Sequence, residues 1–147
     1  MARFDLHNLW ANRYGVLSAG LAFALYWATL APTIMWYDMG EFALGSHVLG
    51  IGHNPGYPLY MIFGKLFTLL PIGDVAYRVN LMSAAWGSAA VFLIFLIVRK
   101  MTGNDFAGFV SAMTVAAGST FWSSAVWAEA HTLNAFLSLL IIYLMLR

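Results

Sequence analysis

The sequence contains no cysteine and few charged residues, and both shortages restrict what the protein can be. Without cysteine, neither a disulfide framework nor a thiolate metal site can form. Charged residues make up only 9% of the 147, against roughly 25% in an ordinary soluble domain, whereas hydrophobic residues reach 62%. The formal net charge of +1 is too small for a nucleic-acid-binding protein or a disordered tail. The composition therefore predicts a protein whose main solvent is lipid.

Long uncharged stretches predict where the chain crosses the membrane. A bilayer core of roughly 30 Å needs about 20 mostly apolar residues per helix. The candidate spans are residues 14–35, 79–98, 107–128 and, shorter than the others, 133–146. The apolar run 58–70 contains Lys65 and is too short to span, so it predicts an interfacial or re-entrant helix. We expect residues 1–147 to form an all-α polytopic transmembrane helical bundle of about four spans, with interfacial helices in the first outer loop.

The distribution of basic residues predicts the orientation in the membrane. Cytoplasmic loops carry an excess of lysine and arginine. With four crossings, one side of the membrane receives Arg3, Arg13, Arg99, Lys100 and Arg147. The other side receives a loop of about residues 36–78 and the turn near Glu129. We therefore expect a cytoplasmic N-terminus, a long first loop outside, and an acidic outer face that carries Asp38, Glu41, Asp74 and Glu129.

Two acids stand together at the start of the outer loop. Asp38 and Glu41 are three residues apart, so in a helix both carboxylates lie on one face. No basic residue is near them in sequence, and like charges this close raise one another's pKa unless a substrate, a metal or a distant base uses them. The alternative is purely structural: Asp38 caps a short helix and Glu41 completes a capping box.

The segment 53–58 reads His-Asn-Pro-Gly-Tyr-Pro and predicts a rigid turn that holds His53 in a fixed direction. Asp38, Glu41, His47 and His53 also offer oxygen and nitrogen ligands to a divalent metal, although their spacing matches no tight metal motif. No metal or other cofactor is assigned. The sequence has no GxSxG, Walker or HExxH motif, and Gly50-Ile51-Gly52 lacks the third glycine of a dinucleotide fingerprint.

Several separated motifs occur in an order that resembles one family. They are WYDMGEF (36–42), HNPGYPLY (53–60), GKLF (64–67), LLP (69–71), YRVNL (77–81) and AEAHTLN (128–134). From residue 36 onward, the chain resembles the N-terminal part of a bacterial membrane family, formerly of unknown function, that is similar to the transmembrane protein O-mannosyltransferases. That family is grouped with the polytopic C-type glycosyltransferases.

The resemblance implies a reaction and roles for particular residues. Such enzymes transfer a sugar, with inversion, from a polyprenyl-phosphate donor to a protein or glycan acceptor on the outer face of the membrane. Asp38 occupies the position of the general base, Glu41 is the second acid of the motif, and His53 and Tyr57 are candidates for substrate binding. The implied location is the bacterial inner membrane. The implied partners are the lipid bilayer and, because family members are longer, a C-terminal part or further transmembrane subunits. No nucleic-acid partner is expected.

The leaving phosphate needs cationic or hydrogen-bond support, and Lys65 and Arg78 are the basic residues on the predicted outer side. Anchoring at the lipid interface is the alternative for both. Glu129 lies near His131 and Asn134; it either forms a structural pair, with Arg78 as the candidate partner, or completes the outer cavity.

Two other functions remain open. Part of a transporter would place ionisable residues inside the spans, whereas the acids here gather outside them. A non-catalytic membrane assembly subunit would fit the short length and the helix faces of small residues, such as Ser83 with Gly87.

Overall fold

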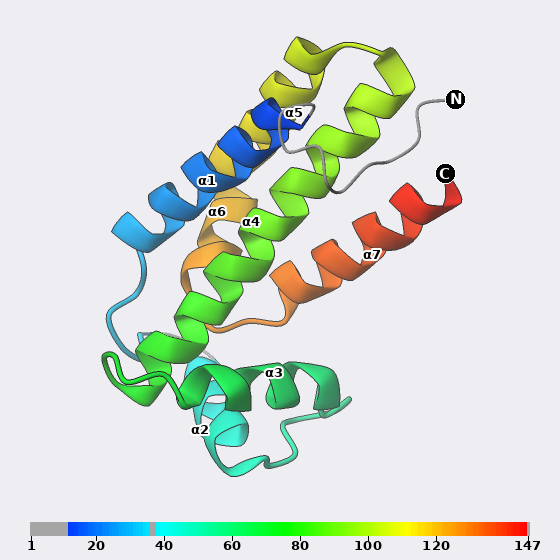
Figure 1. Ribbon diagram of the computed structural model, residues 1–147. Helices are drawn as coiled ribbons and strands as arrows, with labels where there is room; N and C mark the ends of the chain where they lie inside the picture. The colour runs from blue at the N-terminus through cyan, green and yellow to red at the C-terminus, as the bar shows by residue number, and fades with distance from the viewer. Residues whose placement is uncertain (1–11, 36–37, 147) are drawn as a thin grey trace.

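Every element of the protein is helical in the part that the structure describes. The computed structural model describes residues 12–35 and 38–146, and within these ranges it contains α-helices and no strand (Figure 1). The helices are α1 (Arg13–Ala28), α2 (Met39–Val48), α3 (Pro58–Thr68), α4 (Val75–Thr102), α5 (Asp105–Ala117), α6 (Ser119–Val126) and α7 (His131–Met145). The expected all-α class is confirmed.

The long helix α4 is the element against which all the others pack. It begins where the Asp74 carboxylate accepts the N–H of Tyr77 at 2.7 Å, and it ends at Gly103, which has a left-handed backbone with φ 68°. The small side chains expected to allow close helix packing are buried on it: Ser83, Ala84, Gly87 and Ser88. A Cβ on Gly87 would lie 3.1 Å from the Cβ of Ala125, so α6 approaches α4 closely at this point.

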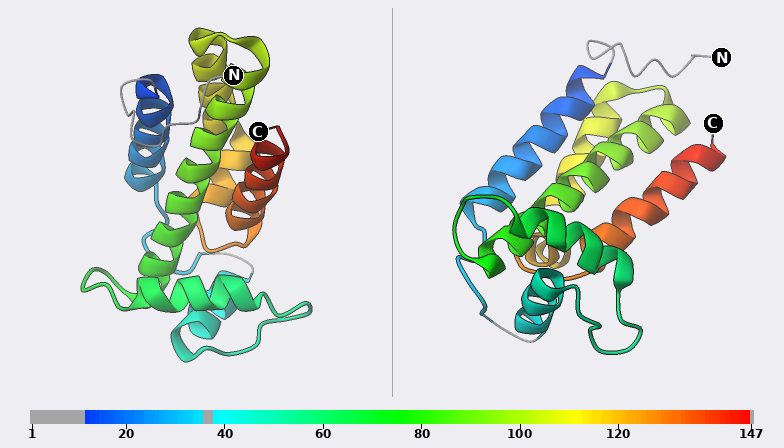
Figure 2. Two further views of the ribbon diagram at one scale, coloured as in Figure 1. Left: turned by 45° about the vertical axis from the view of Figure 1, so that its right-hand side comes forward. Right: turned by 60° about the horizontal axis from the view of Figure 1, so that its bottom comes forward.

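Two short helices close one end of the bundle. α2 and α3 lie across the end where α4 begins, and the start of α1, the α4–α5 turn and the end of α7 lie at the opposite end (Figures 1 and 2). The end with α2 and α3 carries Asp38, Glu41, Lys65, Asp74, Arg78 and Glu129. The opposite end carries Arg13, Arg99, Lys100 and Asp105, with Arg99 Nε 2.7 Å from Asp105 Oδ1. The described charges thus separate into the groups expected from the sequence, and Arg3 and Arg147 lie outside the described residues.

The expectation of four continuous spans is not supported by the lengths of the helices. In the described residues, α4 is the one helix that is long and apolar enough to cross a membrane by itself. The stretch 14–35 yields only the 16 residues of α1, a rise of about 24 Å, which is shorter than the bilayer core. α1 stops because Thr29 closes its last turn onto the Leu25 carbonyl and Pro32 cannot continue a helix.

The other expected spans are interrupted or short. The stretch 107–128 breaks at Gly118, whose extended backbone (φ −63°, ψ 128°) separates α5 from α6. α6 and α7 meet at a bend of 116° and have the length and apolar character of a span only when they are counted together. By length and composition, one helix or at most two in the described part could cross a membrane.

The short helix expected between the two prolines is present as α3. It begins at Pro58, whose fixed φ suits the first position of a helix, and it ends at Thr68 before Pro71. Its inner face buries Tyr60, Met61 and Gly64, and its outer face exposes apolar side chains: Leu59, Ile62, Leu66 and Leu69. An exposed apolar stripe is what an interfacial helix requires, and a position at the membrane surface stays a prediction.

Candidate functional site

The two acids of the WYDMGEF motif lie at the start of α2, but neither caps the helix. Asp38 is the N-cap residue, yet its side chain accepts no hydrogen bond from the helix backbone. Glu41 lies in the first turn, and its carboxylate points to the segment that follows α2 rather than back to Asp38. The capping-box alternative is therefore wrong. Neither carboxylate is used to cap α2, and Glu41 binds the segment that follows the helix instead.

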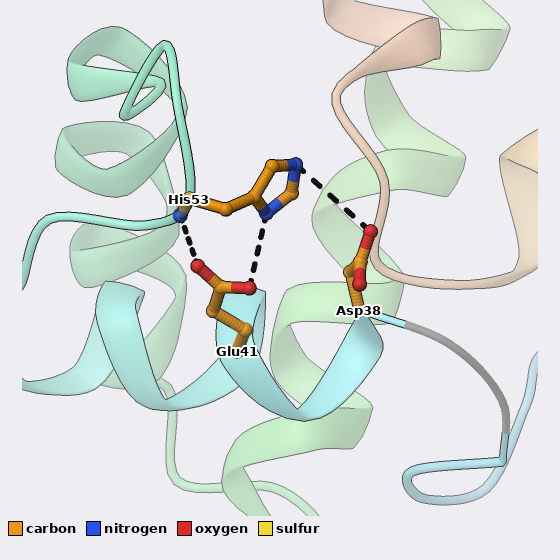
Figure 3. Close-up of side chains that lie close together, drawn as sticks. All are labelled: Asp38, Glu41 and His53. Carbon is orange, nitrogen blue, oxygen red and sulfur yellow. Dashed lines mark hydrogen bonds and ion pairs between the residues drawn. The ribbon is translucent and has the colours of Figure 1, made fainter.

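His53 joins these two acids into a cluster (Figure 3). Its Nδ1 lies 3.0 Å from Glu41 Oε2, and its backbone N–H donates to Glu41 Oε1. Its Nε2 lies 3.9 Å from Asp38 Oδ2. Side-chain exposures of 59% for Asp38, 38% for Glu41 and 42% for His53 leave this Asp38–Glu41–His53 cluster open to solvent. His53 is thus held by Glu41, and a fixed direction imposed by the 53–58 turn itself stays a prediction.

Aromatic side chains set the orientation of the imidazole ring. His53 makes edge-on contacts with Phe42 (centroids 5.9 Å apart) and with Tyr57 (5.4 Å). Phe42 also packs edge-on against Tyr57 at 5.2 Å and against the buried Tyr60 at 4.9 Å. Tyr57, a candidate substrate-binding residue, therefore lies beside the cluster. Residue types alone assigned no role to Phe42; its place beside Glu41 in the WYDMGEF motif was the available signal.

The loop returns to α2 through a close approach at Gly52. A Cβ on this residue would lie 3.2 Å from Glu41 Oε1 and 3.1 Å from the Met61 methyl group. A side chain there would press on the carboxylate that binds His53. Glycine at this position therefore lets the segment before His53 lie directly against Glu41.

The hydrogen bonds from His53 stabilise the ionised form of Glu41. The side-chain bond from His53 lowers the pKa of the Glu41 carboxyl below its ordinary value, and the backbone bond lowers it further. Hydrogen bonds donated to a carboxylate favour its charged form. Glu41 is thus a permanent anion at neutral pH that accepts hydrogen bonds from His53.

Lys65 and Arg78 lie at the joints between helices. Lys65 Nζ donates to the carbonyl of His47 at 2.5 Å, which ties α3 to the last turn of α2. Arg78 donates to the carbonyls of Thr68, Ile72 and Gly73, at 2.7, 2.6 and 2.9 Å, and so closes the end of α3. Among the described residues, no salt bridge joins either cation to a carboxylate. Neither side chain joins the Asp38–Glu41–His53 cluster.

Glu129 pairs with a histidine and not with Arg78. Its Oε2 lies 2.5 Å from His131 Nδ1, so the expected Glu129–Arg78 pair is wrong. Arg78 is occupied by carbonyls, whereas His131 is only two residues from Glu129, at the start of α7. The turn that carries Glu129 packs against α2, because Ala128 and Ala130 share a core with Met39. In Figure 3 this turn passes beside Asp38.

Three of the four candidate metal ligands come together. Asp38, Glu41 and His53 can each present one ligand atom within 4.8 Å of the others, and His47 is not among them. Oxygen and nitrogen ligands of this kind suit several divalent cations. However, Glu41 and His53 Nδ1 are already hydrogen-bond partners, and a cation would compete with that bond. We therefore assign no metal to the cluster.

The part of the chain that matches a known protein family begins at Asp38. Residues 38–147 match the family model described as the Protein O-mannosyl-transferase TMEM260 N-terminal domain. The chain belongs to this family. The resemblance to protein O-mannosyltransferases drawn from the sequence motifs is thus confirmed, and every candidate site residue lies inside the matched range.

Two curated relatives carry the same TMEM260 name. Protein O-mannosyl-transferase TMEM260 of Mus musculus is 36% identical over 112 residues, which are 76% of this chain and 16% of the mouse protein. The Dictyostelium discoideum protein of that name is 30% identical over 113 residues, 75% of this chain and 14% of its own length. The chain therefore spans less than a fifth of either relative. No solved structure matches it.

Proposed function

We propose that this TMEM260-family chain forms the catalytic N-terminal part of a membrane glycosyltransferase. It would transfer a sugar, mannose by the names of its relatives, from a polyprenyl-phosphate donor to a hydroxyl group of a protein or glycan. The observation that carries this proposal is the free carboxylate of Asp38, which caps no helix and faces the Glu41-bound His53. Family membership supports the class of reaction.

Asp38 is the proposed general base. Glycosyl transfer to a hydroxyl requires that the O–H proton leaves as the oxygen attacks the anomeric carbon, and a positioned carboxylate can accept it. With inversion, the attack comes from the face opposite the leaving phosphate. Glu41 supports the base through His53, and Tyr57 offers a ring and a hydroxyl at the edge of the cluster for the sugar.

The leaving phosphate needs positive potential close to the site. Lys65 and Arg78 give their N–H groups to carbonyls, so we propose that they contribute their charge from these fixed places instead of binding the phosphate directly. Glu129 and His131 lie at the turn beside α2 and are proposed to border the Asp38–Glu41–His53 cluster.

We further propose that the end of the bundle with α2 and α3 faces outward from the membrane. The support is the charge separation, with Arg13, Arg99 and Lys100 at the opposite end, where the positive-inside rule would place the cytoplasm. The exposed stripe of α3 would then rest at the outer lipid surface, near the phosphate of a lipid-linked donor.

The test is Asp38→Asn in the full-length gene product, assayed for mannose transfer from a polyprenyl-phosphate donor in membranes. We expect a loss of about 10²–10⁴-fold in the transfer rate, the usual contribution of a general base. Asp74→Asn is the matched control, because Asp74 is an acid at the same end whose oxygens bind Tyr77 N–H and Thr33. Transfer by Asp38→Asn at the rate of this control would refute Asp38 as the base.

A further inference from the structure

The position of His53 is fixed more tightly than a surface loop requires. Glu41 binds it twice, at the backbone N–H and at Nδ1, while Phe42 and Tyr57 contact the ring edge-on. The loop also depends on Gly52 for its approach to Glu41. These contacts determine where the ring lies and also which way it faces.

The bond to Glu41 fixes the tautomer of the neutral imidazole. An ionised carboxylate can only accept a hydrogen bond, so Nδ1, 3.0 Å from Glu41 Oε2, must carry the hydrogen. Nε2 is then the unprotonated nitrogen with a free lone pair. In Figure 3 this nitrogen is turned toward Asp38, whose Oδ2 lies 3.9 Å away. An approach of about 1 Å would bring the two atoms to hydrogen-bond distance.

In the described part of the chain, the turn beside Asp38 carries Glu129 and His131, which pair with each other at 2.5 Å. Asp38 and Glu41 of α2 face its two nitrogens, and the Tyr57 ring contacts its edge. On α3, Lys65 is bound to the His47 carbonyl and the Tyr60 hydroxyl lies 3.3 Å from Ser83 Oγ, so both point elsewhere. A proton on Nε2 would therefore face Asp38, and the charged ring would lie between the carboxylates of Asp38 and Glu41.

We propose that His53 takes over from Asp38 the proton that the acceptor hydroxyl loses, and that Glu41 is the positioning residue that aims His53 at Asp38. The inference rests on the proposed function of Asp38. The acceptor O–H bond breaks as its oxygen bonds to the anomeric carbon, and the bond from that carbon to the donor phosphate breaks, with its electron pair leaving on the phosphate. The proton passes to Asp38 Oδ2 and then to His53 Nε2, which restores the Asp38 carboxylate.

The structural alternative is that Glu41 and His53 only fasten the loop to α2. His53→Asn separates the two roles, because the asparagine amide N–H can replace Nδ1–H as the donor to Glu41 while nothing replaces Nε2. If His53 only attaches the loop to α2, His53→Asn should keep its transfer activity. If His53 accepts the proton, His53→Asn should lose activity. His53→Gln is the complementary variant, since its amide reaches the place of Nε2 and lacks the Nδ1 donor.

The first measurement determines the tautomer of His53 in the wild-type protein. In full-length protein labelled with [15N]histidine, NMR at pH 8 is expected to show His53 with Nδ1 protonated and Nε2 bare, unchanged by EDTA. The signal of His53 is identified by its loss in His53→Asn. Glu41→Gln is expected to abolish the tautomer preference. A wild-type His53 protonated at Nε2, or an Nε2 signal that moves when EDTA is added, would overturn the proposal.

The second measurement is the pH dependence of kcat/KM for mannose transfer. Only neutral His53 can accept a proton, so wild-type activity should fall with acid along a limb of the pH profile that depends on His53. His53→Asn should lose this limb and about tenfold or more of its rate, while its melting temperature stays near wild type. His53→Gln should lose rate and the limb as well.

The results of these experiments separate the assignment of Asp38 as the base from the proton transfer to His53. An inactive Asp38→Asn together with a His53→Asn that keeps the wild-type rate and pH profile would overturn the proton transfer and leave the base assignment intact. A fully active Asp38→Asn would overturn both. Inactivity of Asp38→Asn with loss of the acid limb in His53→Asn would support both.

Discussion

At the scale of single residues, the site depends on where the carboxylate of Glu41 points. The carboxylate crosses from α2 to the loop and binds His53 instead of closing its own helix. This choice leaves Asp38 free and makes Glu41 the link between two segments. The lowered pKa of Glu41 follows from that link, because both hydrogen bonds from His53 favour its charged form.

The lowered pKa predicts a stability that depends on pH. Because Glu41 is more acidic in the folded protein than in the unfolded chain, its contribution is present above the ordinary glutamate range and is lost as pH falls below that range. Glu41→Gln should therefore lower the melting temperature at pH 7, and the difference from wild type should shrink toward acid. Thermal melts in detergent across this pH range would check it. A difference that stays constant with pH would contradict the assignment.

At the scale of elements, α2 keeps its place because it lies unusually close to α3. A Cβ on Gly64 of α3 would lie 2.1 Å from the Oγ of Ser46, which is fully buried on α2. The two helices cannot stay at this distance with any larger residue at position 64. The contact sets the height of α2 over α3, and with it the position of Asp38 and Glu41.

Gly64→Ala should therefore move α2 and reduce both stability and transfer. Overpacking of a buried contact costs about 1–3 kcal/mol, which is measurable as a lower melting temperature. The matched control is Gly20→Ala on α1, where a Cβ meets nothing within 4 Å. A Gly64→Ala protein as stable and active as the Gly20→Ala protein would show that the close approach is not needed.

Sequence reasoning located the elements near the site better than those of the bundle. Pro58 and Pro71 bounded α3 correctly, and the spacing of Asp38 and Glu41 placed them on one helix face. The breaks at Thr29 and Gly118 were missed because apolar composition does not distinguish a continuous helix from an interrupted one. The partners of Arg78 and Glu129 depend on how the chain turns back on itself, which residue spacing alone does not specify.

At the scale of the whole molecule, the charges lie at the two ends of an apolar bundle. Arg99 and Lys100 end α4 at one end, and the Asp38–Glu41–His53 cluster lies beyond the other. The apolar side chains exposed along α1 and α7, such as Leu17, Leu21, Ile141 and Met145, would face lipid or further helices of the full-length protein.

The proposed orientation can be tested because this chain has no cysteine of its own. Met101→Cys at the end of α4 and Asn54→Cys in the loop before α3 both introduce exposed thiols. In intact cells, a membrane-impermeant maleimide should label Asn54→Cys at once and Met101→Cys only after permeabilisation. Labelling of Met101→Cys alone before permeabilisation would reverse the orientation.

The three side chains of the cluster come from one uninterrupted stretch, residues 38 to 53, and this has a consequence for biosynthesis. This stretch leaves the ribosome before any residue of α4, and folding during synthesis tends to proceed from the N-terminal side. Glu41 can therefore form its hydrogen bonds with His53 while α4 is still being synthesised. The Asp38–Glu41–His53 cluster can therefore form before the helix against which α2 later packs exists.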